Sequence, residues 1–256
     1  MILAAHQPNF MPWLGYFDKM QKADVFVTVD HVQMERQSFQ NRTRIKTGEG
    51  VRWITVPVVQ ESRDERLVDK RIDNSRDGRF RWGRKMSLTL KYAYQSARHY
   101  AEYAPVLDEI LEGQWGRLAD LNHALIDFYR AALMIRTPIV RSSELKISGA
   151  KSEMVLNMCR ELGAHAYLSG AGASRNYLDA AAFERAGIEI LWQDFPHPRY
   201  EQRPPSAPFV EKLSALDLLF NCGSESAAFF RARPAEAAEP RPASASAPKA
   251  QPGVLA

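Results

Sequence analysis

Residues 2–30 read ILAAHQPNFMPWLGYFDKMQKADVFVTVD, and this stretch decides the fold. Ile2 to Ala5 is a short apolar run, and Val25 to Val29 is a second run of β-branched and aromatic residues. Both are too short for helices and are typical of buried strands. Between them, apolar side chains recur at helical spacing at Trp13, Phe17 and Met20. The stretch therefore predicts a strand, a helix and a second strand, which form a βαβ unit with a parallel strand pair.

The same alternation returns in the second half of the chain. A helix is expected from Ser152 to Gly163, strands at 166–169 and 188–192, a short helix at 178–185 and a final helix at 213–220. Between the two halves lie an expected strand at 53–58 and helical stretches at 87–103 and 118–134. These patterns predict an α/β fold in which a mostly parallel sheet is flanked by helices and carries a helical insertion.

The composition favours a single folded domain of residues 1–230. The chain has 256 residues, of which 45% are hydrophobic, enough for a sizeable core. From Pro234 the sequence PAEAAEPRPASASAPKAQPGVLA has too few large apolar residues to fold, so we expect residues 231–256 to be a disordered tail. No apolar run is long enough to span a membrane, and the first residues do not form a signal peptide. Two cysteines cannot make a disulfide scaffold, so a soluble cytoplasmic protein is expected.

The charge balance argues for a small ligand rather than a nucleic acid. Lys and Arg number 34 against 30 Asp and Glu, which leaves a net charge of +4 spread among mixed charges. Nucleic-acid binding needs a sustained basic face, whereas a mild excess suits a small anionic or carrier-linked substrate. Residues 60–85 interleave basic and acidic side chains, so they form either a solvated excursion or a mobile loop that closes over an anionic ligand.

Polar clusters follow three of the predicted strands, where ligands of open α/β sheets bind. They are His6-Gln7-Pro8-Asn9, Asp30-His31 and Ser169-Gly170-Ala171-Gly172. His6 is a candidate general base because its ordinary pKa lies near 6.5. The alternative is that it only caps the turn. Asp30 fits a residue that orients this imidazole or contacts a ribose hydroxyl, or else the start of an Asx turn.

Side chains that can donate hydrogen bonds to a substrate are concentrated in one further segment. Gln40, Asn41, Arg42, Arg44 and Lys46 supply amides, guanidinium groups and an amine, unless they form only a polar surface strand. The turn at Ser169–Gly172 offers backbone N–H groups, although it matches neither the dinucleotide fingerprint nor the phosphate-binding loop. No His, Cys or Asp cluster has metal-ligand spacing, and the sequence leaves the cofactor and the oligomeric state open.

The chain resembles the WbqC-like protein family from Ile2 to Gly223. The segments that carry the resemblance are HQPNFMPWLGYFDKMQKADVFVTVD, SFQNRTRIKT, WITVPV, SSELKISGAKSEMVLNMCRELGAHAYLSGAGASRNYLD, GIEILWQDF, HPRYEQ and LSALDLLFNCG, in this order. The family usually has Asp-Asp where this chain has Asp30-His31. The motif positions implied as site residues are His6, Gln7, Asn9, Trp13, Asp30, Gln40, Asn41, Arg42, Tyr167, Ser169, Gly170, Tyr177 and Asp179.

The resemblance implies an enzyme of bacterial O-antigen, surface-polysaccharide or related biosynthesis that modifies a sugar or transfers an acyl or aminoacyl group. In this hypothesis His6 is the general base and Asp30 orients it. A distant likeness to nucleotidyltransferases of the HxGH type gives an alternative, although Leu14-Gly15-Tyr16 stands where a second histidine is needed. A non-catalytic ligand-binding or scaffold protein of a biosynthetic cluster is the other alternative.

Overall fold

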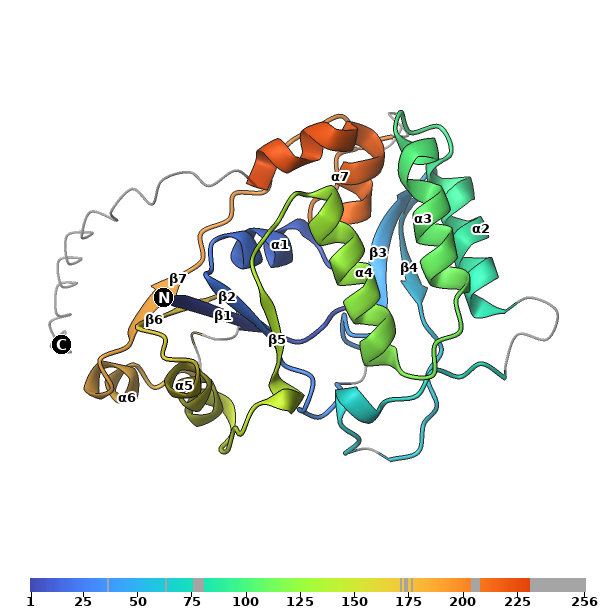
Figure 1. The fold of residues 1–256 in the computed structure, drawn as a ribbon. Coiled ribbons are helices and arrows are strands. Elements are labelled where there is room, and N and C mark those ends of the chain that lie inside the picture. Colours follow the sequence, from blue (N-terminus) through green and yellow to red (C-terminus); the bar gives the residue numbers. More distant parts are fainter. Residues whose placement is uncertain are drawn as a thin grey trace, which may run out of the picture.

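The centre of the fold is a parallel sheet. The structure is a computed structural model, and it describes residues 1–35, 37–62, 64–75, 81–170, 172, 175, 177–203 and 208–230. Within these residues a five-stranded sheet has the order β5-β2-β1-β6-β7, and all its neighbouring strands run parallel (Figure 1). The strands are β1 (Ile2–His6), β2 (Val25–Thr28), β5 (Ile139–Arg141), β6 (Ala166–Ser169) and β7 (Glu189–Trp192). The prediction of an α/β fold built on a parallel sheet is confirmed.

The first strand lies in the middle of the sheet, and the chain winds outward from it twice. β2 and β5 are added on one side of β1, and β6 and β7 are then added on the other side. The strand order therefore reverses between β1 and β6, as it does in doubly wound α/β folds. Such a reversal leaves a crevice beyond the carboxyl ends of the two central strands, because the connections leave them in opposite directions.

Helices cover both faces of the sheet because successive residues of a strand point to opposite faces. Leu3 and Ala5 of β1 belong to one core cluster, which includes residues of α5 (Lys151–Glu161) and α6 (Ala180–Arg185). Ala4 belongs to a second, larger cluster, which includes residues of α1 (Leu14–Gln21) and α4 (Leu118–Ala132). By this alternation His6 points to the α1 face.

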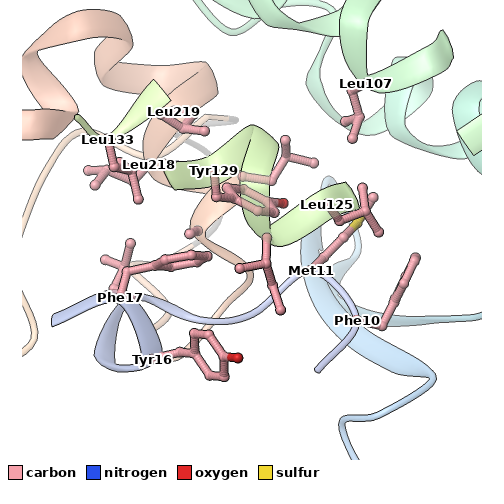
Figure 2. Close-up of a cluster of buried hydrophobic side chains, with 14 of the residues drawn as sticks. Phe10, Met11, Tyr16, Phe17, Leu107, Leu125, Tyr129, Leu133, Leu218 and Leu219 are labelled. Carbon is pink, nitrogen blue, oxygen red and sulfur yellow. The ribbon is translucent and has the colours of Figure 1, made fainter. Parts of the chain in front are cut away.

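The larger core joins helices that are distant in the sequence. Figure 2 shows Phe17 of α1, Tyr129 of α4 and Leu218 of α7 (Ala215–Cys222) converging in it. The rings of Phe17 and Tyr129 are 5.2 Å apart, and all three side chains are fully buried. Burial of each such side chain contributes roughly 1.5–3 kcal/mol to folding, so α1 is held firmly against the sheet.

A hairpin and two helices form the insertion, and Figure 1 shows α4 between them and the parallel sheet. β3 (Arg42–Thr47) pairs antiparallel with β4 (Gly50–Thr55), and α2 (Trp82–Tyr94) packs on α3 (Tyr100–Glu112). The strand expected at 53–58 thus starts and ends earlier and lies outside the main sheet. The helix expected at 87–103 is two helices, because the chain turns back on itself. At Gly83 a Cβ atom would lie 1.9 Å from the carbonyl oxygen of Leu111, so only glycine permits this close packing.

The charged stretch 60–85 is partly built into the fold. Leu67 in the 3-10 helix η1 (Leu67–Asp69), Lys70 and Ile72 are all buried, so the stretch is not a purely solvated excursion. Residues 63 and 76–80 of the stretch lie outside the described residues, as do residue 171 of the glycine-containing turn and the expected tail at 231–256. Among the described helices, none has the length and apolar character needed to cross a membrane.

Candidate functional site

The three polar clusters predicted from the sequence meet at the carboxyl edge of the sheet. β1 and β2 pair in a register that sets His6 beside Thr28, so Asp30 follows two residues beyond. β1 and β6 pair as far as Ala4 and Leu168, so Ser169 and Gly170 follow next to the end of β1. The clusters therefore flank the point at which the strand order reverses.

His6 is half-buried at this edge and is held in one tautomer. Its Nδ1 lies 3.1 Å from the carbonyl oxygen of Gln7, so a neutral ring donates from Nδ1 and keeps the lone pair of Nε2 for a proton. The ring meets Tyr16 edge to face at 5.1 Å. Burial, and next the charge of Lys19, lower the pKa of His6 to about 3. The imidazole is therefore neutral at physiological pH.

Lys19 of α1 also lies at this edge, where its charge acts on His6, although its sequence pattern did not single it out. Its side chain is buried, with 4% of its surface exposed, and its Nζ donates to the carbonyl oxygen of Ala5 at 2.8 Å. Burial lowers the pKa of this amine to about 7. A lysine on an amphipathic helix looks like a surface residue in the sequence, and only the packing of α1 on β1 reveals its position.

Asp30 joins the end of β2 to the chain after β5. Its buried carboxylate accepts hydrogen bonds from Ser142 Oγ at 3.0 Å, from the backbone N–H of Ser143 at 2.9 Å and from Ser143 Oγ at 3.0 Å. Nδ1 of His31 lies 2.6 Å from the same Ser142 hydroxyl. The partners found for the carboxylate of Asp30 are thus these two serines of η2 (Ser142–Glu144), which the sequence analysis did not single out.

Amide groups hold the loop that carries His6 and Gln7. Nε2 of Gln40 donates to Oε1 of Gln7 at 2.8 Å, and Oε1 of Gln40 accepts from the backbone N–H of Glu35 at 2.9 Å. From α4, Nδ2 of Asn122 donates to the carbonyl oxygens of Pro8 and Gln40, both at 2.8 Å. Gln40 and Asn122 are fully buried and Asn9 is nearly so, which makes the loop rigid.

A cavity of about 310 Å³ lies next to these amides. It is lined by Met34, Glu35, Gln37, Asn41, Val58, Gln60, Ser62, Glu65 and Lys70. Nζ of Lys70 is 2.7 Å from Oε2 of Glu65, and both side chains are largely buried. Because Gln40 bonds to both Glu35 and Gln7, one side chain separates this cavity from the His6 loop.

The basic residues of the hairpin make contacts away from the sheet edge. The guanidinium of Arg42 stacks over the ring of Trp53 at 4.3 Å, and Nη2 of Arg44 donates to the carbonyl oxygen of Lys212 at 2.8 Å. Lys46 is buried. Burial raises the pKa of Asp217 to about 6, and the charge of Lys46 acts in the opposite direction by lowering it. Asn41 lines the cavity and donates to the carbonyl oxygen of Val56 at 3.0 Å.

The remaining predicted residues have structural contacts of their own. Trp13 precedes α1, and its ring lies 5.7 Å from that of Phe195. Asp179 caps α6 by accepting a hydrogen bond from the backbone N–H of Ala182 at 3.0 Å. Tyr177 is 40% exposed. Within the described ranges no group of three or more His, Cys, Asp or Glu side chains is placed to hold a metal ion.

Comparison with known proteins identifies the family. The model of the WbqC-like protein family matches residues 7–229, and the chain belongs to this family. The protein called Uncharacterized protein Rv1507c, from Mycobacterium tuberculosis (strain ATCC 25618 / H37Rv), is 34% identical over 230 residues, which cover 90% of this chain and 97% of that protein. No solved structure matches the chain significantly.

Proposed function

We propose that this WbqC-like protein is a cytoplasmic enzyme that transfers an acyl or aminoacyl group to a small or carrier-linked substrate in bacterial O-antigen, surface-polysaccharide or related biosynthesis. One observation carries the proposal: His6, a neutral imidazole, ends the central strand at the point where the strand order reverses. Ligands of doubly wound sheets bind at this point. No described residue bonds to Nε2 of this ring, which leaves that nitrogen for a substrate.

His6 acts as the general base in this reaction. The amine or hydroxyl of the acceptor donates a hydrogen bond to Nε2, and the ring takes its proton as the nucleophile attacks the acyl carbon. The bond from the acyl carbon to the leaving group then breaks, and the proton on Nε2 passes to the leaving group. The Gln7 carbonyl keeps Nδ1 protonated and the ring oriented. A positioned base of this kind contributes about 10²–10⁴-fold to a rate.

The base strength of His6 depends on its burial and, second, on the charge of Lys19. A pKa of about 3 is too low for an efficient base near neutral pH. Burial and the Lys19 charge both lower this pKa, so neutralisation of Lys19 by a bound group moves it back toward its ordinary value. Because burial is the larger cause of the lowered pKa, substrate binding at Lys19 raises the pKa of His6 part of the way and so strengthens the base.

The cavity at Glu35 supports a place for the acceptor. Its lining combines two carboxylates, an ammonium group and three amides, which bind hydroxyl and amine groups of a small polar molecule. Asn41, which the resemblance implies as a site residue, is one of the lining amides. Next to the end of β1, a Cβ at Gly170 would meet no atom of the described residues within 4 Å, which supports a place for the donor beside the backbone of this turn.

Nucleotidyl transfer is the second candidate, favoured by the strand order. The order reverses at the central strand, and the His6 loop leads directly into α1, as in nucleotide-binding doubly wound folds. In this candidate the same loop binds the phosphates of a nucleoside triphosphate.

A thermal-shift screen separates the candidates. Wild-type protein is heated with nucleotides, nucleotide sugars and acyl-CoA compounds, and each compound that stabilises it is tested for transfer by mass spectrometry. Acyl or aminoacyl transfer that is lost in His6→Asn supports the first candidate. Release of pyrophosphate from a nucleoside triphosphate supports the second. If none of the compounds stabilises the protein, both enzyme proposals fail and a scaffold function is favoured.

A further inference from the structure

The carbonyl oxygen of Ala5 points toward β6 beyond the last paired residues of the two strands. The space between the carboxyl ends of β1 and β6 is called the gap below. The backbone N–H of His165 donates to the carbonyl of Met1, and that of Asp24 donates to the carbonyl of Ile2. Successive carbonyls of a strand point to opposite neighbours, so the carbonyls of residues 1, 3 and 5 face β6. The pairing of β1 with β6 ends at Ala4 and Leu168. Ala5 is therefore the first residue whose β6-facing carbonyl lies beyond the ladder.

The ammonium group of Lys19 occupies this gap. Its Nζ donates to the Ala5 carbonyl at 2.8 Å, the one hydrogen bond found for this amine among the described residues. An ammonium group has three donors, so two are left for other partners. The neighbouring carboxylate of Asp18 pairs with Lys22 instead, and in the described part of the chain no carboxylate pairs with Lys19.

A buried ammonium group without a counter-ion is costly. Lys and Glu side chains are almost never fully buried unless they are paired. Lys70 follows this rule, because it is equally buried but bonds to Glu65 at 2.7 Å. Lys19 departs from it, and the lowered pKa of its amine has burial as its cause. A bound anion would supply the counter-ion that the described residues do not give to Lys19.

The gap has room for a ligand and lies where ligands of such sheets bind. The ends of β1 and β6 flank the reversal of strand order. A Cβ atom built at Gly170 would meet no atom of the described residues within 4 Å, so the backbone directly after β6 has space beside it. His6 follows Ala5 directly, which sets this space next to the imidazole.

We propose that Lys19 binds an oxyanion of the substrate, a phosphate or a carboxylate, in the gap between the carboxyl ends of β1 and β6. This inference rests on the proposed function only in placing the substrate at this edge of the sheet. It adds the ligand class and the residue that recognises it. The bound anion completes the ion pair that Lys19 lacks and offsets the charge that, after burial, is the second cause of the lowered pKa of His6.

Anion binding by the full-length protein tests the inference. Melting temperatures are measured with inorganic pyrophosphate and with citrate, against sodium chloride of equal ionic strength. We expect the wild type to be stabilised by one of the two, and the one that stabilises it identifies phosphate or carboxylate as the ligand group. Lys19→Met fills the same space without a charge and is expected to bind that anion at least tenfold more weakly. Lys91→Met, at an exposed lysine of α2, is expected to bind it as the wild type does.

Chemical labelling gives a second readout that requires no activity. Acetylation of Lys19 by acetic anhydride, followed by mass spectrometry, is expected to slow at least tenfold when the stabilising anion is present, whereas acetylation of Lys91 is unchanged. The inference is overturned if neither anion stabilises the wild type, or if Lys19→Met binds the anion as tightly as the wild type. It is likewise overturned if the anion leaves Lys19 acetylation unchanged.

The two proposals fail independently. Anion binding that depends on Lys19, in a protein that transfers no group, overturns the proposed function alone. Group transfer by a Lys19→Met variant that binds its anion normally overturns the inference alone.

Discussion

Nε2 of Gln40 donates to Oε1 of Gln7 at 2.8 Å, so an amide just before β3 holds the loop that carries His6. The other end of the same amide bonds to the backbone of Glu35 at the cavity. Gln40 is thus a link between the two parts of the candidate site, because both its donor and its acceptor are bonded to protein groups.

Replacing Gln40 by leucine should therefore destabilise the fold. The change leaves two part-buried groups, Oε1 of Gln7 and the N–H of Glu35, without their partner. Each costs up to about 1–3 kcal/mol where water does not replace the lost bond. Urea denaturation measures the loss. Gln60→Leu, at an exposed residue of the cavity rim, should stay within about 0.5 kcal/mol of the wild type. Equal stability of the two variants would show that the Gln40 bonds contribute nothing.

Replacing His6 should slow turnover strongly while the fold is kept. His6→Ala and His6→Asn should each lower kcat by about 10²–10⁴-fold, because neither side chain accepts a proton near neutral pH. His165→Asn, at an exposed residue just before β6 on the opposite edge of the sheet, should keep full activity. If His6 is only a turn cap, asparagine replaces it well, and an active His6→Asn enzyme would remove His6 as the base.

Glu35 should act on substrate binding and not on stability. Its side chain is exposed at the cavity, and its carboxylate bonds to no described residue. Glu35→Gln should raise KM for the acceptor about tenfold and change the free energy of unfolding by less than about 0.5 kcal/mol. Glu49→Gln, in the exposed β3–β4 turn, is the matched control and should leave KM unchanged. An unchanged KM in Glu35→Gln would place the acceptor elsewhere.

Asp217 should make stability fall as the pH rises from about 4 to 6. Burial raises its pKa from 3.8 to about 6. Between these values the folded protein binds more protons than the unfolded chain, so raising the pH favours unfolding. Asp217→Asn should remove this part of the profile, a difference of about 1–3 kcal/mol near pH 7. Urea titrations of both proteins from pH 4 to pH 7 measure it, and parallel profiles would contradict the raised pKa.

Lys19 should have the opposite effect at higher pH, where it should make the free energy of unfolding rise with pH. Burial lowers its pKa from 10.5 to about 7, so between these values the unfolded chain binds the additional proton. Stability should then rise with pH over this range, by up to about 1.4 kcal/mol per unit. Lys19→Met should lack this rise, whereas Lys91→Met should keep it. Urea titrations from pH 7 to pH 10 give the comparison.

Local patterns predicted the sheet edge but not its long-range partners. The apolar runs at Ile2 and Val25 identified two adjacent strands, and the polar residues after them were correctly placed at one edge. The spacing of apolar residues also located β6 and β7 to within a residue. Parallel strands of this kind are short and nearly continuous in apolar residues, which makes them visible in a sequence.

Contacts between distant segments could not be read in the same way. Ser142 reaches Asp30 from 112 residues away, and the Asn122 amide reaches Pro8 across 114. The hairpin arginines were ambiguous because stacking of Arg42 on Trp53 needs the strand register, which a single strand pattern does not give. Lys19 has the spacing of a surface residue, and its burial follows from how closely α1 packs on the sheet.

The central position of β1 sets the order in which the chain can fold. The ribosome makes β1 first, yet its second neighbour β6 begins 164 positions later, because Ile2 pairs with Ala166. Until β6 has been synthesised, one edge of the central strand has no pairing partner. The gap next to Lys19 is then bordered by β1 alone. Pairings this distant in the sequence are slow to form. We therefore expect the candidate site to be completed only when the second half of the sheet docks on the first.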